Sequence, residues 1–172
     1  MSSRICIDDV VAFEKRIPRL AEILIDAVAG GAGVSFMHPL SQKDAEAFWH
    51  SQLDGIKSGM TFPVIAEHEG KTVGIVLLIK AWAPNQPHRA DIAKMLVHRN
   101  HRRHGFATHL IRALEDKAKE LGLTLLTFDA VAGSGAAKFY ERLGFINVGE
   151  IPGYAYSGTG KLDGTCFFYK KL

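Results

Sequence analysis

The chain has 172 residues, of which 47% are hydrophobic and 23% are charged, and these values predict a single folded domain spanning residues 1–172. The formal net charge is only +3, and the Lys and Arg residues are scattered along the chain except in residues 99–103. This distribution favours one local anion site and argues against a nucleic-acid partner.

The two cysteines, Cys6 and Cys166, lie near opposite ends of the chain, without the spacing of a disulfide framework or a metal site. Both are therefore expected to be buried thiols. Residues 1–10 do not have the pattern of a secretory signal, and the longest apolar stretches, such as residues 73–79, are too short to cross a bilayer as a helix. We expect a cytoplasmic protein with no membrane partner.

The first part of the sequence predicts a short strand followed by two helices. Residues 4–7 can form the strand, and residues 13–28 place apolar side chains at helical spacing. The glycine-rich residues 30–39 are expected to form a mobile, partly apolar loop after this helix. A second helix, with Ser41 as its N-cap, is predicted to continue to about residue 56.

Three strands are predicted next. Residues 62–67 and 72–81 are rich in β-branched side chains, and residues 68–71 between them are typical of a tight hairpin turn. Residues 89–97 form the third strand. Its alternation predicts residues 90, 92 and 94 on one face and residues 91, 93 and 95 on the other.

The rest of the chain alternates between helices and strands. We predict a helix over residues 105–121, a strand over 123–130, a short helix over 136–143, and strands over 145–150 and 165–170. The element order predicts an α/β protein in which a mixed sheet carries helices on its faces.

A basic turn joins one predicted strand directly to a helix within residues 96–108. The first turn of a helix has unpaired backbone N–H groups and the positive end of the helix dipole. Gly105 would let an anion approach the backbone closely. Phosphate is the natural ligand for such a turn, although a solvated basic turn would have the same sequence.

Two further patterns in the sequence resemble ligand-binding motifs, but neither is expected to bind a ligand. Histidines at positions 98, 101 and 104 would not converge easily on one ion across a turn into a helix, so no metal site is expected. Residues 158–161 superficially resemble a phosphate-binding loop, but leucine follows the lysine where serine or threonine is required. They are expected to form a hairpin loop.

Two motifs in order resemble the GNAT family of acetyltransferases. The first is Arg102-x-x-Gly105-x-Ala107 after an apolar strand, and the second is the aromatic-rich segment at residues 138–145. The resemblance implies the GNAT acyl-CoA N-acyltransferase fold, with a central mixed, mostly antiparallel sheet flanked by helices. It also implies that acetyl-CoA is the cosubstrate, that a small-molecule amine is the acceptor, that no metal is needed, and that the protein is a monomer or a homodimer.

The resemblance further implies where acetyl-CoA binds. Its pantetheine arm would lie between strands that separate near residues 97 and 130, and the basic turn would receive its pyrophosphate. The binding residues implied in this way are Met95, Leu96, Val97, Arg102, Arg103, His104, Gly105, Phe106, Ala107, Thr108, Ser134, Lys138 and Phe139.

Three residues are candidates for catalysis. By resemblance, Tyr140 is the general acid that protonates the departing thiolate; a core aromatic residue is the alternative. Asp91 and Asp129 lie on strands that would be neighbours, and either could be the base that accepts the proton of the amine. Alternatively, one of them binds the ammonium group of the substrate or caps a loop.

A narrower resemblance connects residues 30–37, 89–94, 128–129 and 150–154 to GNAT enzymes that acetylate an amino-acid-like toxin. It implies a small amino-acid-like acceptor and a role in antibiotic or toxin resistance. Asp91 stands where those enzymes have a glutamate, so its carboxylate reaches less far. A peptide or protein N-terminal acetyltransferase and a non-catalytic acyl-CoA-binding sensor remain the alternatives.

Overall fold

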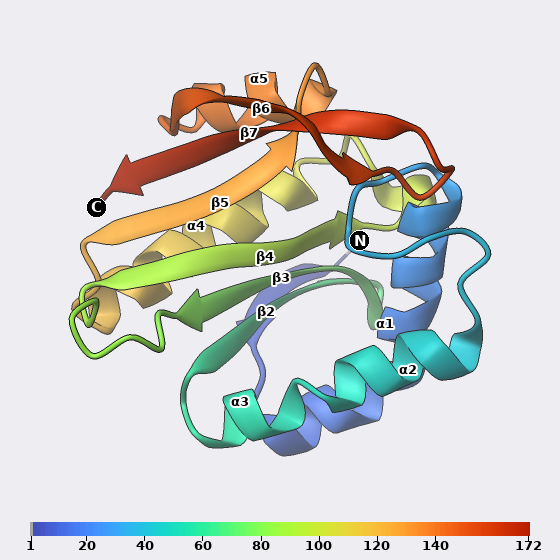
Figure 1. Cartoon of the computed structure of the whole chain (residues 1–172). Coiled ribbons are helices and arrows are strands. Elements are labelled where there is room, and N and C mark those ends of the chain that lie inside the picture. The colour runs from blue at the N-terminus through green and yellow to red at the C-terminus, as the bar shows by residue number, and fades with distance from the viewer. Residues whose placement is uncertain (1) are drawn as a thin grey trace.

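The computed structural model describes residues 2–172, in which seven strands form one sheet (Figure 1). In their order across the sheet the strands are β1 (Ser3–Ile7), β2 (Thr61–His68), β3 (Lys71–Lys80), β4 (Arg89–Val97), β5 (Leu125–Val131), β7 (Leu162–Lys171) and β6 (Ile146–Tyr156). Neighbouring strands are antiparallel except for β4 and β5, which are parallel. The predicted mixed, mostly antiparallel sheet is therefore confirmed.

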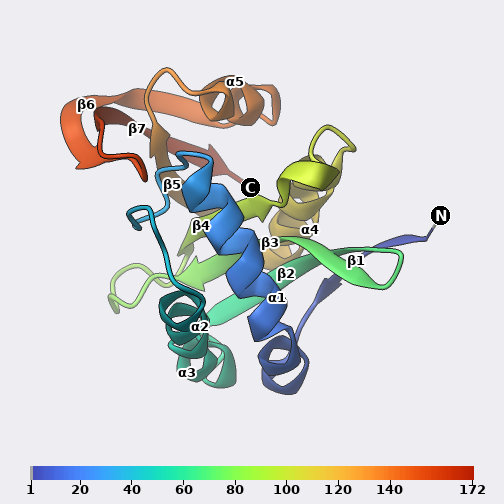
Figure 2. The ribbon, with the colours of Figure 1, turned by 90° about the vertical axis from the view of Figure 1, so that its right-hand side faces the viewer.

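Helices cover both faces of the sheet (Figure 2). One face carries α1 (Val10–Ala29), α2 (Gln42–His50) and α3 (Leu53–Lys57), and the other carries α4 (Phe106–Glu120) and α5 (Gly135–Arg142). Each helix layer buries its apolar stripe against the sheet, which gives two hydrophobic cores. Within residues 2–172, no helix combines the length and the hydrophobicity needed to cross a membrane.

The prediction that the second helix continues to about residue 56 is wrong, because α2 ends at His50 and the short α3 follows it. Its start is confirmed, since the Ser41 hydroxyl accepts a hydrogen bond from the backbone N–H of Asp44 at 3.1 Å. At its end the Ser51 hydroxyl donates to the backbone carbonyl of Phe48 at 2.7 Å. Such local bonds of serine compete with the helical ladder, and residues 51–52 form a turn between α2 and α3.

The C-terminal hairpin is longer than the sequence predicted. β6 was expected to end at residue 150 but continues to Tyr156, and its pairing with β7 is irregular between Ile151 and Ala155. Pro152 and Gly153, residue types that often interrupt a strand, lie in this irregular segment. Because β6 is an edge strand, a proline there removes no bond that the sheet needs. The loop at residues 158–161 is confirmed.

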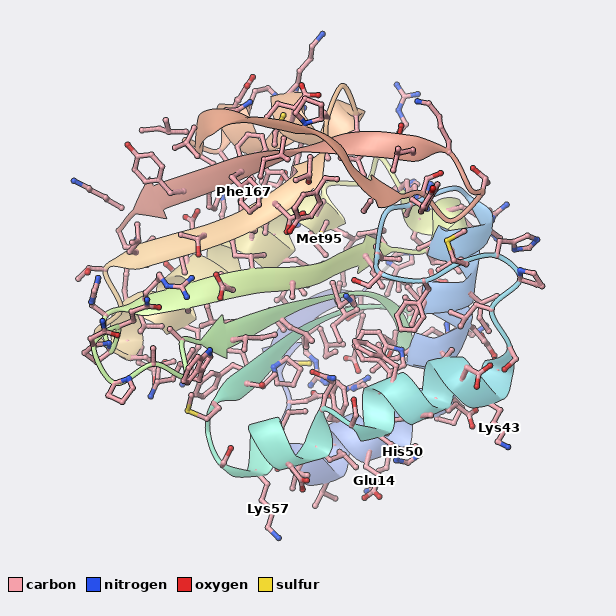
Figure 3. The ribbon with its side chains drawn as sticks, in the orientation of Figure 1. Glu14, Lys43, His50, Lys57, Met95 and Phe167 are labelled. Carbon is pink, nitrogen blue, oxygen red and sulfur yellow. The ribbon has the colours of Figure 1, made fainter. Side chains whose placement is uncertain are left out.

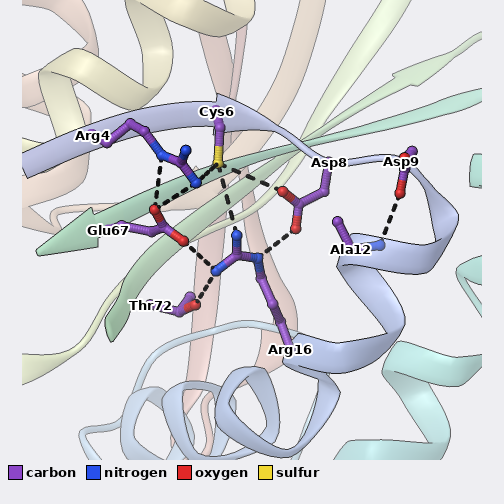
Figure 4. Close-up of polar contacts among 8 residues, drawn as sticks. All are labelled: Arg4, Cys6, Asp8, Asp9, Ala12, Arg16, Glu67 and Thr72. Carbon is purple, nitrogen blue, oxygen red and sulfur yellow. Dashed lines mark hydrogen bonds and ion pairs between the residues drawn. The ribbon is translucent and has the colours of Figure 1, made fainter. Parts of the chain in front are cut away.

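A partly buried arginine of α1 joins the first strand to the rest of the sheet (Figure 4). The Arg16 guanidinium donates from Nε to Asp8 at 2.6 Å and from one terminal nitrogen to Thr72 at 2.9 Å, and it pairs with Glu67 at 2.6 Å. Arg4 also pairs with Glu67 at 2.8 Å. These contacts hold α1, β1, β2 and β3 in a fixed relation.

The cysteines are both free. Cys166 is buried in the core beneath α4 and α5, as predicted, whereas Cys6 is only partly buried beside the Arg16 cluster. Desolvation, together with the nearby charge of Asp8, raises the pKa of the Cys6 thiol.

Close packing at Gly74 gives a prediction about stability. A Cβ at this position on β3 would lie 2.8 Å from the Leu96 carbonyl oxygen and 3.2 Å from both Leu110 and Val97. We expect Gly74→Ala to lower the free energy of unfolding by about 1–3 kcal/mol, because β4 or α4 must move to relieve the overlap. Urea denaturation followed by circular dichroism measures this change.

Gly135→Ala is the matched control, because a Cβ at Gly135 would have no neighbour within 4 Å. In the absence of overlap, and because Gly135 is the first residue of α5, this exchange should change the free energy of unfolding by less than about 0.5 kcal/mol. Equal unfolding midpoints for the two variants would contradict close packing at Gly74.

Candidate active site

β4 and β5 separate from one another along their length. They are paired only where Arg89, Ala90 and Asp91 face residues 125–127, and beyond this point the two strands diverge (Figure 1). Met95 lies on β4 where the strands have moved apart (Figure 3). The predicted separation between the strands that end near residues 97 and 130 is therefore present.

A β-bulge lies in β4 next to this separation. Lys94 and Met95 occupy β4 where β3 has only Val76 between its paired residues, and Lys94 has a φ of 51°. The bulge reverses the alternation of the strand, so that the Lys94 ammonium lies over the Phe48 ring of α2, 5.2 Å from its centroid. The prediction that Lys94 and Ile92 share a face is therefore wrong, since Ile92 packs in the core beneath α4.

One cavity, of about 570 Å³ and called here the first cavity, lies between the end of β4 and the start of α4. Of the predicted acetyl-CoA-binding residues it is lined by Met95, Leu96, Val97, Arg102, Arg103, Gly105, Phe106, Ala107, Thr108 and Phe139. The predicted residues His104 and Lys138 are exposed and do not line it. The sequence did not identify Ala27, Ala32, Val34, His101 and Arg142, which also line it.

The N-terminus of α4 opens into this first cavity. Gly105 precedes the helix with a φ of 81°, and no side chain caps the first helical turn, whereas Asp9 caps α1. The backbone N–H groups of Phe106, Ala107 and Thr108 therefore have no partner within the helix and carry the positive end of its dipole. This geometry suits a phosphate group.

Asp26 of α1 fixes the turn that leads into α4. Its carboxylate accepts a hydrogen bond from the backbone N–H of Arg99 at 3.0 Å and from the side chain of the same residue. Arg102 approaches the same carboxylate at 3.7 Å and donates to the Val97 carbonyl at 3.0 Å. Although burial alone would raise the pKa of Asp26, its hydrogen bonds with Arg99 hold that pKa below its ordinary value.

The second cavity, of about 400 Å³, lies between β4, β5, α5 and the loop that follows α1. Tyr140, Asp129 and Ser134 line it, together with Lys94 and residues 31–35. It shares Ala32, Val34 and Met95 with the first cavity, so the two spaces adjoin. The predicted loop over residues 30–39 thus forms one wall of this site.

Tyr140 presents a largely buried phenol to the second cavity. Its side chain is 7% exposed, and its ring packs against Phe128 with the centroids 4.2 Å apart. Burial raises the pKa of Tyr140 well above its ordinary value. The hydroxyl is therefore protonated at neutral pH, as a proton donor must be.

The two candidate carboxylates have different surroundings. Asp129 lines the second cavity and accepts a hydrogen bond from the Thr165 hydroxyl at 2.9 Å. Asp91 does not line it; its side chain, 45% exposed, forms an ion pair with Arg89 at 2.5 Å and accepts a hydrogen bond from Thr127. The structure therefore brings Asp129 and Tyr140 together and leaves Asp91 outside.

The predicted binding residue Ser134 has a distinct position at the start of α5. Its hydroxyl is buried and has no hydrogen-bond partner among residues 2–172. Since it lines the second cavity and not the first, it lies closer to Tyr140 than to the basic turn. A buried hydroxyl of this kind is available to a ligand.

Two of the three histidines of the basic turn, His98 and His101, form an aromatic cluster with His68. The His98 and His101 rings are 6.1 Å apart, and His101 is 5.8 Å from His68 of β2. Within residues 2–172, no group of three or more His, Cys, Asp or Glu side chains is arranged to hold a metal ion. Burial, with the positive charge around it, lowers the pKa of His101.

Comparison with known proteins identifies the class. Residues 26–145 match the Acetyltransferase (GNAT) family. Because the match extends over more than half of the sequence, the chain belongs to the GNAT family of acetyltransferases.

Solved structures with the same fold cover almost the whole chain. An N-acetyltransferase from Staphylococcus aureus Mu50 has a TM-score of 0.82 at 16% identity over 99% of both chains. A ribosomal-protein-alanine N-acetyltransferase from Brucella melitensis has a TM-score of 0.80 at 21% identity, covering 97% of this chain and 99% of its own. The yncA protein of Salmonella typhimurium, assigned as an acetyltransferase and solved with its cofactor acetyl-CoA, has a TM-score of 0.81 at 16% identity, covering 100% of this chain and 95% of its own.

Proposed function

We propose that this protein transfers an acetyl group from acetyl-CoA directly to the amino group of a small amino-acid-like molecule. The observation that carries the proposal is the adjoining pair of cavities, which meet at Met95. The first has the phosphate-binding geometry of the α4 N-terminus, and the second contains an acid and a base. A relative of the same fold was solved with acetyl-CoA, which supports its use as the cosubstrate.

Residues of the second cavity supply the proton transfers. An amine is protonated at neutral pH and must lose a proton before it can attack a carbonyl carbon. Asp129 accepts this proton, directly or through a water molecule. The new C–N bond forms as the C–S bond of the thioester breaks, and the Tyr140 hydroxyl donates its proton to the sulfur. The attacking nitrogen then loses its second surplus proton, which restores the Tyr140 hydroxyl through solvent and leaves a neutral amide. Acetyl-CoA supplies the activated acyl group.

The acceptor is proposed from the size of the second cavity and from resemblance. A cavity of about 400 Å³ suits a small molecule, whereas a peptide would need a longer groove. Residues 30–37, 89–94, 128–129 and 150–154 resemble the tabtoxin resistance acetyltransferase, which supports an amino-acid-like acceptor and a role in resistance. Asp91 departs from the glutamate of that enzyme, so the particular acceptor can differ.

The proposal is tested by following the release of coenzyme A from acetyl-CoA with a thiol reagent. The acceptors are free amino acids, β-lactam amino acids, polyamines and short peptides, and a reaction without an amine is the control. We expect an amino acid or a β-lactam amino acid to stimulate release above the control. Stimulation by peptides alone would favour an N-terminal acetyltransferase, and tight binding of acetyl-CoA without release would favour a non-catalytic sensor.

A further inference from the structure

Lys94 is an unneutralised cation in the wall of the second cavity. Its ammonium group lies over the Phe48 ring and within 3.4 Å of the Ser35 hydroxyl. Neither contact cancels its charge. Asp129 is near enough for its charge to act on Lys94, but no carboxylate among residues 2–172 lies within ion-pair distance of the ammonium. An ammonium group has three donors, so Lys94 can donate to a further partner.

The position of this lysine is set by the backbone. Lys94 is the bulged residue of β4 and has a φ of 51°, a conformation that non-glycine residues rarely adopt. The bulge moves its side chain to the face that carries α2, next to the loop residues 31–35 that form one wall of the second cavity. Residues held in such conformations are concentrated at functional sites.

The charges that line the second cavity match one class of molecule. Of its described lining residues, only Lys94 and Asp129 carry a charge, and they have opposite signs. An α-amino acid carries an ammonium group and a carboxylate group on the same carbon atom. A polyamine has no group that could use the lysine, and its positive charge would be repelled.

We propose that Lys94 binds the carboxylate of the acceptor and thereby restricts the enzyme to free amino acids and other zwitterionic amines. This inference rests on the proposed function and specifies the substrate class of the same site. With its carboxylate on Lys94, the acceptor presents its amino group toward Asp129. Desolvation lowers the pKa of the Lys94 ammonium, and the negative charge of Asp129 partly opposes this effect.

The surroundings of Lys94 do not match those of a lysine that only stabilises the fold. A lysine that served only to pair with Asp129 would lie within ion-pair distance of it, but Asp129 bonds Thr165 instead. Covering the Phe48 ring alone would not require a lysine in the wall of a cavity. Lys94 instead lines the cavity that contains Tyr140.

The test compares binding of each of the twenty common L-amino acids with binding of its C-terminal amide. Calorimetry measures the affinity of each compound for the protein saturated with coenzyme A, and thiol release from acetyl-CoA is measured in parallel. The variants are Lys94→Met, which removes the charge, and Lys94→Arg, which keeps it. Lys43→Met is the matched control, because Lys43 is exposed on α2 and projects away from Met95 (Figure 3).

We expect at least one amino acid to bind the unmodified protein about 10- to 100-fold more tightly than its amide, the usual effect of a charged hydrogen bond. Lys94→Met should remove this preference, because it weakens binding of the amino acid and leaves binding of the amide unchanged. Lys94→Arg should retain part of the preference, and Lys43→Met should retain all of it.

Equal binding of acids and amides, no binding of either, or a preference that survives Lys94→Met would each overturn the assignment. Acids that bind through Lys94 without thiol release would support carboxylate recognition while contradicting the proposed function. Rapid thiol release with amides or polyamines would keep the function and reject the role of Lys94.

Discussion

Tyr140→Phe should lower kcat by about 10²-fold or more, since general acid catalysis typically contributes 10²- to 10⁴-fold. The affinity for acetyl-CoA should change little, because Tyr140 lies outside the first cavity. Phenylalanine keeps the ring that packs on Phe128, so the fold should be retained. Steady-state thiol release gives kcat, and calorimetry gives the dissociation constant of acetyl-CoA.

Tyr156→Phe provides the same chemical change at an exposed site on β6 and should leave both quantities unaltered. The buried environment of Tyr140 also makes the pH dependence informative. Because burial raises the pKa of the phenol, the unmodified enzyme should keep its acid through moderately alkaline pH. If Tyr140→Phe turns over as fast as the parent protein, Tyr140 is a packing residue and not the acid.

Asp129→Asn should lower kcat/KM at pH 7 by about 10²-fold, the effect expected for loss of a general base. Asparagine can still accept the hydrogen bond from Thr165, so the loss should come from the proton acceptor and not from local unfolding. The defect should become smaller as pH rises, because more of the amine is then already neutral. A pH profile of kcat/KM with the best acceptor measures both effects.

The comparison that decides between the two candidate bases is Asp91→Asn. Asp91 is engaged with Arg89 and Thr127 outside the second cavity, so its replacement should change kcat/KM by less than about threefold, as for most surface substitutions. A larger loss in Asp91→Asn than in Asp129→Asn would identify Asp91 as the base.

The sequence predicted the fold well because its signals are local. Apolar periodicity identified the strands and long helices, and Ser41 marked the start of α2 correctly. The errors occurred where a local rule was overridden: Ser51 ends α2 early, and Pro152 does not end β6, because that strand is at the edge of the sheet. Edge position depends on the whole topology and is not visible in a short window of sequence.

The candidate site was predicted less completely than the fold. Two positively charged residues that line the cavities, Arg142 and Lys94, were not predicted, for different reasons. Arg142 lies three residues after Phe139, which brings both to one side of α5, so helical spacing could have identified it. Lys94 could not have been found in this way, because the bulge that redirects its side chain comes from pairing with β3. Alternation alone placed Lys94 on the wrong face.

The short contact between β4 and β5, three residue pairs in length, gives the sheet an internal edge in addition to its two outer ones. Unpaired strand edges usually invite another strand, and with it aggregation. This edge lies inside the sheet, where it faces the widening gap between β4 and β5 and is surrounded by the residues that line the second cavity. The sheet therefore has unpaired peptide groups in its interior without presenting them at an outer edge, where another protein could pair with them.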